Sequence, residues 1–192
     1  RLMPDSPDDF NKLEQRIAGS IITFVGSNSP ANLASRPKRT VIQDETDKFP
    51  ESGRREGSAS GLADQRTKRY TLPFRVKTST PTITSGTIYK EHSKGDCRKY
   101  LGPCPNCGEP IELFFEQIKW DSAAKRADGK WNLEEVRKSA RYECQICAGM
   151  MDEHQKGEFI EKAQWTPTNP DADPAYRSYH LASWYAPWLQ CS

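Results

Sequence analysis

The stretch Thr-Val-Ile-Gln-Asp-Glu-Thr-Asp, residues 40–47, indicates the fold class of this chain. Residues 40–42 carry β-branched side chains, which predicts a buried strand over residues 40–43. Asp44, Glu45 and Asp47 follow at its C-terminal end, where α/β sheets present side chains for chemistry. Such a strand suits a nucleotide hydrolase, in which Asp44 would hold Mg²⁺ through water and Glu45 would polarise the attacking water. The alternative is an ordinary acidic turn.

The flanking sequence extends this pattern of alternating elements. Apolar residues at helical spacing predict a short amphipathic helix over residues 8–18, which Gly19 would end. A β-branched and aromatic run predicts a buried strand over residues 21–25, and another strand over residues 75–79 leads into a Thr-Pro turn. Helix followed by strand indicates an α/β domain.

Other segments are poorer in apolar residues. Residues 27–38 read as a polar, proline-punctuated loop, and residues 51–69 as a mobile surface loop or a poorly ordered helix. Asn132 precedes Leu133 with Glu135 three residues on, which predicts a helix start. The aromatic tail over residues 176–188 is expected to return as a strand to the main core. At Gln43 a buried parallel strand would prefer an apolar residue.

Length and charge exclude few functions. A chain of 192 residues fits one domain with an insertion, and 28 basic against 26 acidic residues leave a net charge of +2 that argues neither for nor against nucleic acid. No run of about 18 apolar residues exists and the N-terminus is unlike a signal peptide, so we expect a soluble, unexported protein. The first residue is Arg1 instead of Met, and we expect an upstream portion to be missing.

Two C-x-x-C pairs predict a zinc site. Each pair can place two thiolates on one side of a tight knuckle, and two knuckles complete a tetrahedron. The four predicted ligands are Cys104, Cys107, Cys144 and Cys147. Disulfides or buried apolar cysteines are the alternative, but paired C-x-x-C motifs are poor disulfide frameworks. A closed four-cysteine site would be structural; Gly108 suits its turn, Ala148 departs from it, and Cys97 and Cys191 read as packing residues.

Residues 26–50 also resemble a known family. Their G-x-N-S-P-A-x-L-x-S-R-P loop, the strand ending in D-E-x-D and the following aromatic and proline resemble the Walker B region of lambda-type phage terminase large subunits. Residues 78–82 resemble the coupling motif of that family, which senses the γ-phosphate. Residues 100–120 and 180–188 continue the resemblance, which covers essentially the whole chain.

The resemblance implies a fold and a set of site residues. The fold would be α/β, a partial P-loop NTPase parallel sheet of the ASCE type with an inserted four-cysteine zinc ribbon. Residues 1–96 would belong to the ATPase domain, residues 97–165 to the ribbon, and residues 166–192 to a segment returning to the ATPase core. The implied residues are Asp44 and Glu45 for hydrolysis and Ser79, Thr80 and Pro81 for coupling. Apart from the resemblance, Arg36 is a candidate for a phosphate or nucleotide contact, because a guanidinium stabilises charge on a phosphoryl group.

The resemblance implies a packaging motor as the parent protein. It would hydrolyse ATP with Mg²⁺, translocate double-stranded viral DNA into a prohead, and cleave DNA with a nuclease domain outside these residues. The terminase small subunit and the portal would be partners, a homo-oligomeric ring the working form, and the host bacterial cytoplasm the location, with no membrane.

The phosphate-binding loop of such a motor is not in this sequence. No G-x-x-x-x-G-K-[ST] motif occurs, and the one Gly-Lys pair, residues 129–130, is followed by Trp131. The chain alone is therefore expected to be inactive. A helicase-like DExD motor and a non-catalytic zinc-ribbon module that binds nucleic acid or protein stay open as alternatives.

Basic residues near the acidic strand are candidates for DNA phosphate contacts. They are Arg36, Lys38, Arg39, Arg54, Arg55, Arg66, Lys68 and Arg69. A solvated surface or, for Arg36, a loop-anchoring salt bridge is the alternative. His92, His154 and His180 show no ligand-like spacing and read as structural.

Overall fold

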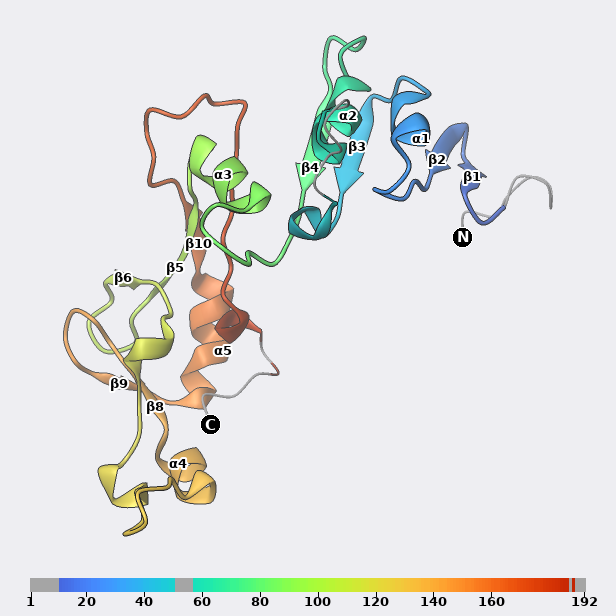
Figure 1. The fold of residues 1–192 in the computed structure, drawn as a ribbon. Coiled ribbons are helices and arrows are strands. Elements are labelled where there is room, and N and C mark those ends of the chain that lie inside the picture. The colour runs from blue at the N-terminus through green and yellow to red at the C-terminus, as the bar shows by residue number, and fades with distance from the viewer. Residues whose placement is uncertain (1–10, 51–56, 187, 189–192) are drawn as a thin grey trace. The chain divides into compact units, whose positions relative to one another are not determined.

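The computed structural model describes residues 11–50, 57–186 and 188, and the chain forms two compact units that divide between Lys90 and Glu91 (Figure 1). Both units mix helices with short strands. The first contains a parallel strand pair, and the second contains two antiparallel sheets and a four-cysteine cluster. Within the described residues, no helix combines the length and apolar character needed to cross a bilayer.

The first unit begins with a hairpin instead of the predicted helix. β1 (Glu14–Ile17) pairs antiparallel with β2 (Ser20–Thr23) through Ala18 and Gly19, which have φ of 48° and 74°. Two left-handed residues between strands make a tight hairpin turn, so Gly19 serves the hairpin and not a helix end. The prediction of a helix over residues 8–18 is therefore wrong for residues 11–18, while residues 8–10 lie outside the described residues. The strand over residues 21–25 exists through Thr23 but is exposed, not buried.

The parallel pair confirms the strand at residues 40–43. β3 (Thr40–Gln43) pairs with β4 (Phe74–Lys77), and the register sets Gln43 opposite Lys77. β4 thus begins one residue earlier than the strand predicted over residues 75–79, and it ends two residues earlier. A short helix, α1 (Pro30–Ala34), interrupts the predicted loop over residues 27–38, with proline at its first position.

The connection between these strands contains a helix where the sequence predicted a mobile surface loop or a poorly ordered helix; residues 51–56 of that prediction lie outside the described residues. α2 (Ala59–Gln65) starts at Ser58, whose side-chain oxygen accepts the N–H of Gly61 at 3.1 Å. The helix buries small side chains, including Ala59 and Ala63, so its packed face carries few large apolar residues. The low apolar content of residues 51–69 therefore concealed a packed helix.

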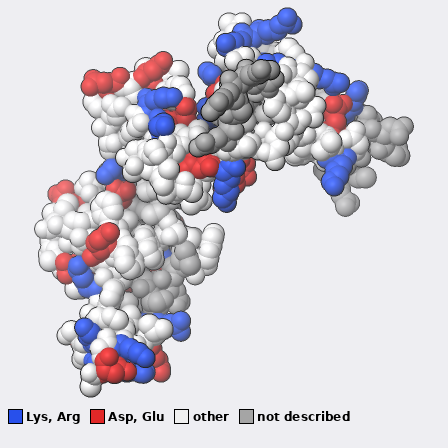
Figure 2. Space-filling model, viewed as in Figure 1, with Lys and Arg blue, Asp and Glu red and all other residues white. Residues whose placement is uncertain are grey.

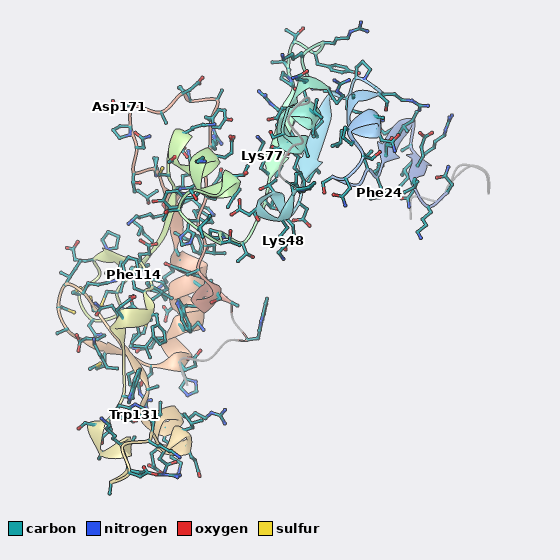
Figure 3. All side chains as sticks on the ribbon, in the orientation of Figure 1. Phe24, Lys48, Lys77, Phe114, Trp131 and Asp171 are labelled. Carbon is teal, nitrogen blue, oxygen red and sulfur yellow. The ribbon has the colours of Figure 1, made fainter. Side chains whose placement is uncertain are left out.

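A buried polar network explains the departure at Gln43. Gln43 is 4% exposed, and its Nε2 donates to Asp64 Oδ1 of α2 at 2.8 Å. The other oxygen of Asp64 forms an ion pair with Lys77 Nζ of β4 at 2.7 Å; Lys77 is labelled in Figure 3. Since buried polar groups need partners, this network fixes α2 against both strands.

Two elements of the first unit follow the strand ends. A 3₁₀ turn, η2 (Thr46–Lys48), comes directly after the acidic pair. The helix α3 (Thr87–Lys94) follows the coupling segment and continues across the unit boundary.

The second unit packs its core between two small sheets. β5 (Lys99–Pro103) lies between β10 (Gln164–Thr166) and β6 (Pro110–Ile111), and β8 (Arg141–Glu143) lies between β7 (Ile118–Lys119) and β9 (Met150–Met151). The helices are α4 (Leu133–Ser139) and α5 (Glu153–Lys162), and the short 3₁₀ turns are Phe115–Gln117, Ser122–Ala124 and Ser183–Tyr185. The helix start at Asn132 is confirmed, because its Oδ1 accepts the N–H of Glu134 at 3.3 Å.

The described part of the tail packs into this core. Tyr185 is 5% exposed; its hydroxyl donates to Tyr100 O at 2.6 Å and accepts the N–H of Leu113 at 2.9 Å. Burial raises the pKa of Tyr185 to about 12, which keeps this hydroxyl a donor. Between residues 176 and 186 the tail forms one isolated bridge, at Tyr179, and a 3₁₀ turn instead of the predicted strand. Its assignment to the ATPase core stays a prediction.

Two glycines of the second unit should respond oppositely to alanine. A Cβ on Gly102 would lie 2.6 Å from the ring of Phe159 and 2.8 Å from its carbonyl oxygen. Gly157 is exposed within α5, with open space around the added atom. We expect Gly102→Ala to destabilise the unit by about 1–3 kcal/mol and Gly157→Ala to stabilise it by about 0.5–1 kcal/mol. Denaturant melts of both variants measure the difference; equal effects would contradict this packing.

Candidate nucleotide-hydrolysis site and metal centre

The predicted hydrolysis and coupling residues meet at one edge of the parallel pair. Asp44 and Glu45 follow the last residue of β3, and residues 78–81 follow the last residue of β4. Because the strands are parallel and in register, both segments leave the sheet at the same end.

Direct hydrogen bonds join the two segments. The Thr78 hydroxyl donates to Asp44 Oδ1, and the Thr78 N–H donates to Gln43 O at 2.8 Å. The carbonyl of Thr78 in turn accepts the N–H of Thr46 at 3.1 Å. The pairing of the strands therefore continues past their ends, and Asp44 is held against the first residue of the coupling segment.

Glu45 has a left-handed backbone, with φ of 57° and ψ of 44°. A residue other than glycine in this conformation costs on the order of 1–3 kcal/mol, and such residues gather at functional sites. The turn ends β3 abruptly, and the carboxylate of Glu45 lies 3.3 Å from Lys48 Nζ. Both side chains are about half exposed or more, so this ion pair is weak and open to exchange.

Ser79 also faces the acidic strand end. Its Oγ accepts the N–H of Asp47 at 3.1 Å. Thr80 and Pro81 follow in the same segment and are exposed. All three predicted coupling residues therefore lie in the segment that pairs with the carboxylate strand end.

The four predicted zinc ligands converge on one point. Their sulfur atoms all lie within 4.8 Å of one another, with 3.9 Å between Cys104 and Cys147 and 4.0 Å between Cys107 and Cys144. A tetrahedral zinc with sulfur ligands at about 2.3 Å requires sulfurs about 3.8 Å apart. The cluster therefore has the donors and spacing of a structural zinc site.

The two knuckles have matching backbone geometry. The N–H of Gly108 donates to Cys104 O at 2.8 Å, and the N–H of Ala148 donates to Cys144 O at 3.0 Å. Gly108 and Ala148 both have positive φ, at 78° and 55°. Ala148 thus takes the conformation that favours glycine, and the departure from the usual knuckle leaves the turn intact.

The peptide groups of both knuckles donate toward the sulfurs, but the four neighbouring thiols oppose joint ionisation: the pKa of Cys107 rises to about 12 and burial raises that of Cys144. Burial opposes ionisation of Cys104, but the N–H groups of Cys107 and Asn106 and neighbouring thiols donate toward its sulfur, so the pKa of Cys104 falls to about 7. Ile146 and Gly149 donate to the sulfurs of the second knuckle, each at 3.4 Å. Of Cys104, Cys107 and Cys144, only Cys104 is thus shifted toward the thiolate by the protein itself, and a bound dication would be needed to hold all four sulfurs ionised.

A family model described as the ATPase domain of the phage terminase large subunit gpA matches residues 1–165. The chain belongs to this terminase family. The match spans the acidic strand end, the coupling segment and all four cysteines. Comparisons with curated proteins and with solved structures gave no match. Membership confirms the resemblance and supports ATP hydrolysis and a role in a phage DNA-packaging motor.

In this terminase chain Arg36 forms a salt bridge, as expected if it anchors its loop. It follows the end of α1, and its NH1 lies 3.3 Å from Glu14 Oε2 of β1. The arginine side chain is 68% exposed, so the guanidinium is open to solvent. Its contact with phosphate or nucleotide stays a prediction.

The candidate DNA contacts divide into anchored and exposed side chains. Lys38 donates to Thr23 Oγ1 at 2.9 Å, and Arg66 donates to carbonyls of Ala34 and Leu62. Lys68 and Arg69 are exposed in the turn between α2 and β4, where Figure 2 shows Lys and Arg side chains along the top of the first unit. Arg54 and Arg55 lie outside the described residues.

Some of the remaining polar side chains lie near one another in ways that sequence spacing did not reveal. The rings of His92 and His180 are 6.3 Å apart, although 87 positions separate them in the chain. Burial and the nearby His180 lower the pKa of His92, so this imidazole stays neutral. The Cys97 thiol donates to His92 O at 3.4 Å and takes no part in the cysteine cluster. Cys191 lies outside the described residues.

Proposed function

We propose that this chain supplies the hydrolysis carboxylates, the coupling segment and a zinc ribbon of an ATP-driven motor that packages double-stranded viral DNA. The observation that carries the proposal is the hydrogen bond from Thr78 to Asp44 at the shared end of two parallel strands. The bond joins a carboxylate suited to Mg²⁺ with a segment suited to sense the nucleotide.

The roles follow from the positions of the side chains. Asp44 would hold Mg²⁺, which when bound neutralises charge on the phosphates; one of its oxygens accepts from Thr78 and the residue is exposed. Glu45 would polarise the attacking water after release from Lys48. Ser79, Thr80 and Pro81 would move with the nucleotide state and so couple hydrolysis to DNA movement.

The remaining parts would belong to the larger motor. Residues 1–96 would complete a P-loop NTPase sheet of the ASCE type with a phosphate-binding loop from elsewhere in the protein. Residues 97–165 would be the ribbon, stapled by Zn²⁺ on the four cysteines, and residues 166–192 the return segment. Partners would be the small subunit, the portal and further copies in a ring, and a nuclease domain would cut the DNA.

Asp44→Asn tests the magnesium role. In the full-length terminase large subunit that carries this sequence, we expect ATP turnover to fall about 100-fold, because a neutral amide binds the dication poorly. Excess Mg²⁺ should restore part of the rate, and a phosphate-release assay across Mg²⁺ concentrations measures both effects. Asp171→Asn, the same change at an exposed position labelled in Figure 3, is the control. Turnover that matches this control would contradict the role.

A further inference from the structure

The third acid of the D-E-x-D stretch holds the coupling segment in place. We infer that Asp47 is a positioning residue that fixes the segment around Thr80 and Pro81 against the carboxylate strand end. The inference rests on the proposed function, because it assigns Asp47 a task in the same ATPase site.

Asp47 forms hydrogen bonds with three distant residues, accepting from two of them and donating to the third. Its Oδ1 accepts the N–H of Ile88 at 2.7 Å. Its Oδ2 accepts the N–H and the hydroxyl of Thr82 at 3.3 and 3.4 Å, and its own N–H donates to Ser79 Oγ at 3.1 Å. Ser79 and Thr82 flank Thr80 and Pro81, so Asp47 is hydrogen-bonded to the coupling segment on both sides of these two residues.

Gly86 makes this close approach possible. A Cβ at this position would lie 2.5 Å from Asp47 Oδ2 and 3.0 Å from Ile83 O. Any larger residue would push the carboxylate away from its donors. The loop that leads into α3 therefore lies against the carboxylate at Gly86, and the N–H of Ile88 in the first turn of that helix binds it directly.

The hydrogen bonding separates the role of Asp47 from that of Asp44. The N–H of Ile88 is the largest influence on Asp47 and, with the Thr82 donors, lowers the pKa of this carboxyl. Both of its oxygens are engaged by N–H and O–H donors, which leaves Asp47 poorly placed to hold a metal ion. Asp44, three residues earlier, accepts from a hydroxyl and from the adjacent Glu45 N–H, and both of these donors reach the same oxygen. A displacement of the C-terminal end of β3 would thus be transmitted to the coupling segment through Asp47.

The test uses the full-length terminase and three readouts. For Asp47→Ala we expect an unchanged KM for ATP, a kcat lowered about tenfold and a several-fold drop in base pairs packaged per ATP. Asp47→Asn should recover part of the packaging ratio, which is the number of base pairs packaged per ATP, because its amide oxygen can still accept one N–H group. Gly86→Ala keeps the carboxylate but displaces it, so it should lower the packaging ratio as Asp47→Ala does.

The outcomes separate this inference from the proposed function. Thermal melts identify variants that unfold; if Asp47→Ala does, Asp47→Asn and Gly86→Ala decide the question. A wild-type packaging ratio in the folded variants, together with loss of turnover in Glu45→Gln, overturns only the role of Asp47. Wild-type turnover in Glu45→Gln overturns the ATPase site and this inference with it. A reduced ratio with unchanged KM supports the inference.

Discussion

Replacement of Cys104 by serine is expected to release the zinc and unfold the second unit. Cys104 and Cys144 are each 3% exposed and belong to the hydrophobic core, while the strands around them are only two to five residues long. Structural zinc contributes about 10–16 kcal/mol in small zinc domains, as much as the whole stability of a typical protein at about 5–15 kcal/mol. Zinc content by mass spectrometry and melting by circular dichroism measure the loss.

Cys97→Ser provides the matched control for this prediction. Its thiol donates to the carbonyls of His92 and Gly95, which a hydroxyl can also do, and it lies outside the cysteine cluster. We expect one zinc per chain and an almost unchanged melt for this variant. A Cys104→Ser protein that keeps the wild-type fold without metal would exclude a structural zinc site.

Glu45→Gln is expected to bind ATP but hydrolyse it about 1000-fold more slowly, within the range for loss of a general base. Glutamine keeps the size of the side chain and its hydrogen-bonding capacity but cannot take a proton from water. The altered residue would also lose its ion pair with Lys48, which is exposed and contributes little. Phosphate release by the full-length terminase at saturating ATP, together with a nucleotide-binding titration, measures both properties.

The control for Glu45→Gln is the same exchange at Glu161, an exposed position in α5. This variant should hydrolyse ATP at the wild-type rate. If Glu45→Gln also matches the wild type, the ATPase site proposed at the end of β3 is wrong. If it loses nucleotide binding, its effect lies in the ground state and not in the chemical step.

The sequence patterns that predicted structure well were those with strict geometric requirements. Two C-x-x-C pairs need four sulfurs within bonding reach of one ion, and the cluster confirms that arrangement. The strands predicted at residues 40–43 and 75–79 reflect a local preference, and β3 and β4 form there as a parallel pair, with β4 shifted toward the N-terminus. Asp44 meets the coupling segment because β3 and β4 run parallel. The sequence indicated two strands but did not determine their relative direction.

Tertiary and local hydrogen bonding decided the elements that were missed. Asn11 Oδ1 accepts the N–H groups of Leu13 and Glu14 at 2.9 and 2.6 Å, which directs the chain into a hairpin instead of a helix. α2 buries small residues and a polar network, neither of which gives an apolar periodicity. The described tail is held by separate contacts of Ser178 and Tyr185, which give no strand pattern.

Within the site, the sequence predicted which residues are acidic and close together, but it did not predict that Asp47 has a different role from Asp44 and Glu45. Asp47 stood beside Asp44 and Glu45 in the sequence, but its bonds to Thr82 and Ile88 depend on a fold that returns the chain 35 or more positions later. The left-handed backbone of Glu45 has no sequence signal, because glutamate seldom takes that conformation.

The central claim is that the strand-end carboxylate and the coupling segment work as one unit, and a double-mutant cycle on ATP turnover tests it most directly. Thr78→Val removes the hydroxyl that binds Asp44 and should slow turnover about tenfold, the expected cost of one hydrogen bond to a charged group. The account predicts that Asp44→Asn combined with Thr78→Val is no slower than Asp44→Asn alone. Losses that multiply in the double variant would contradict it, because the two residues would then act independently.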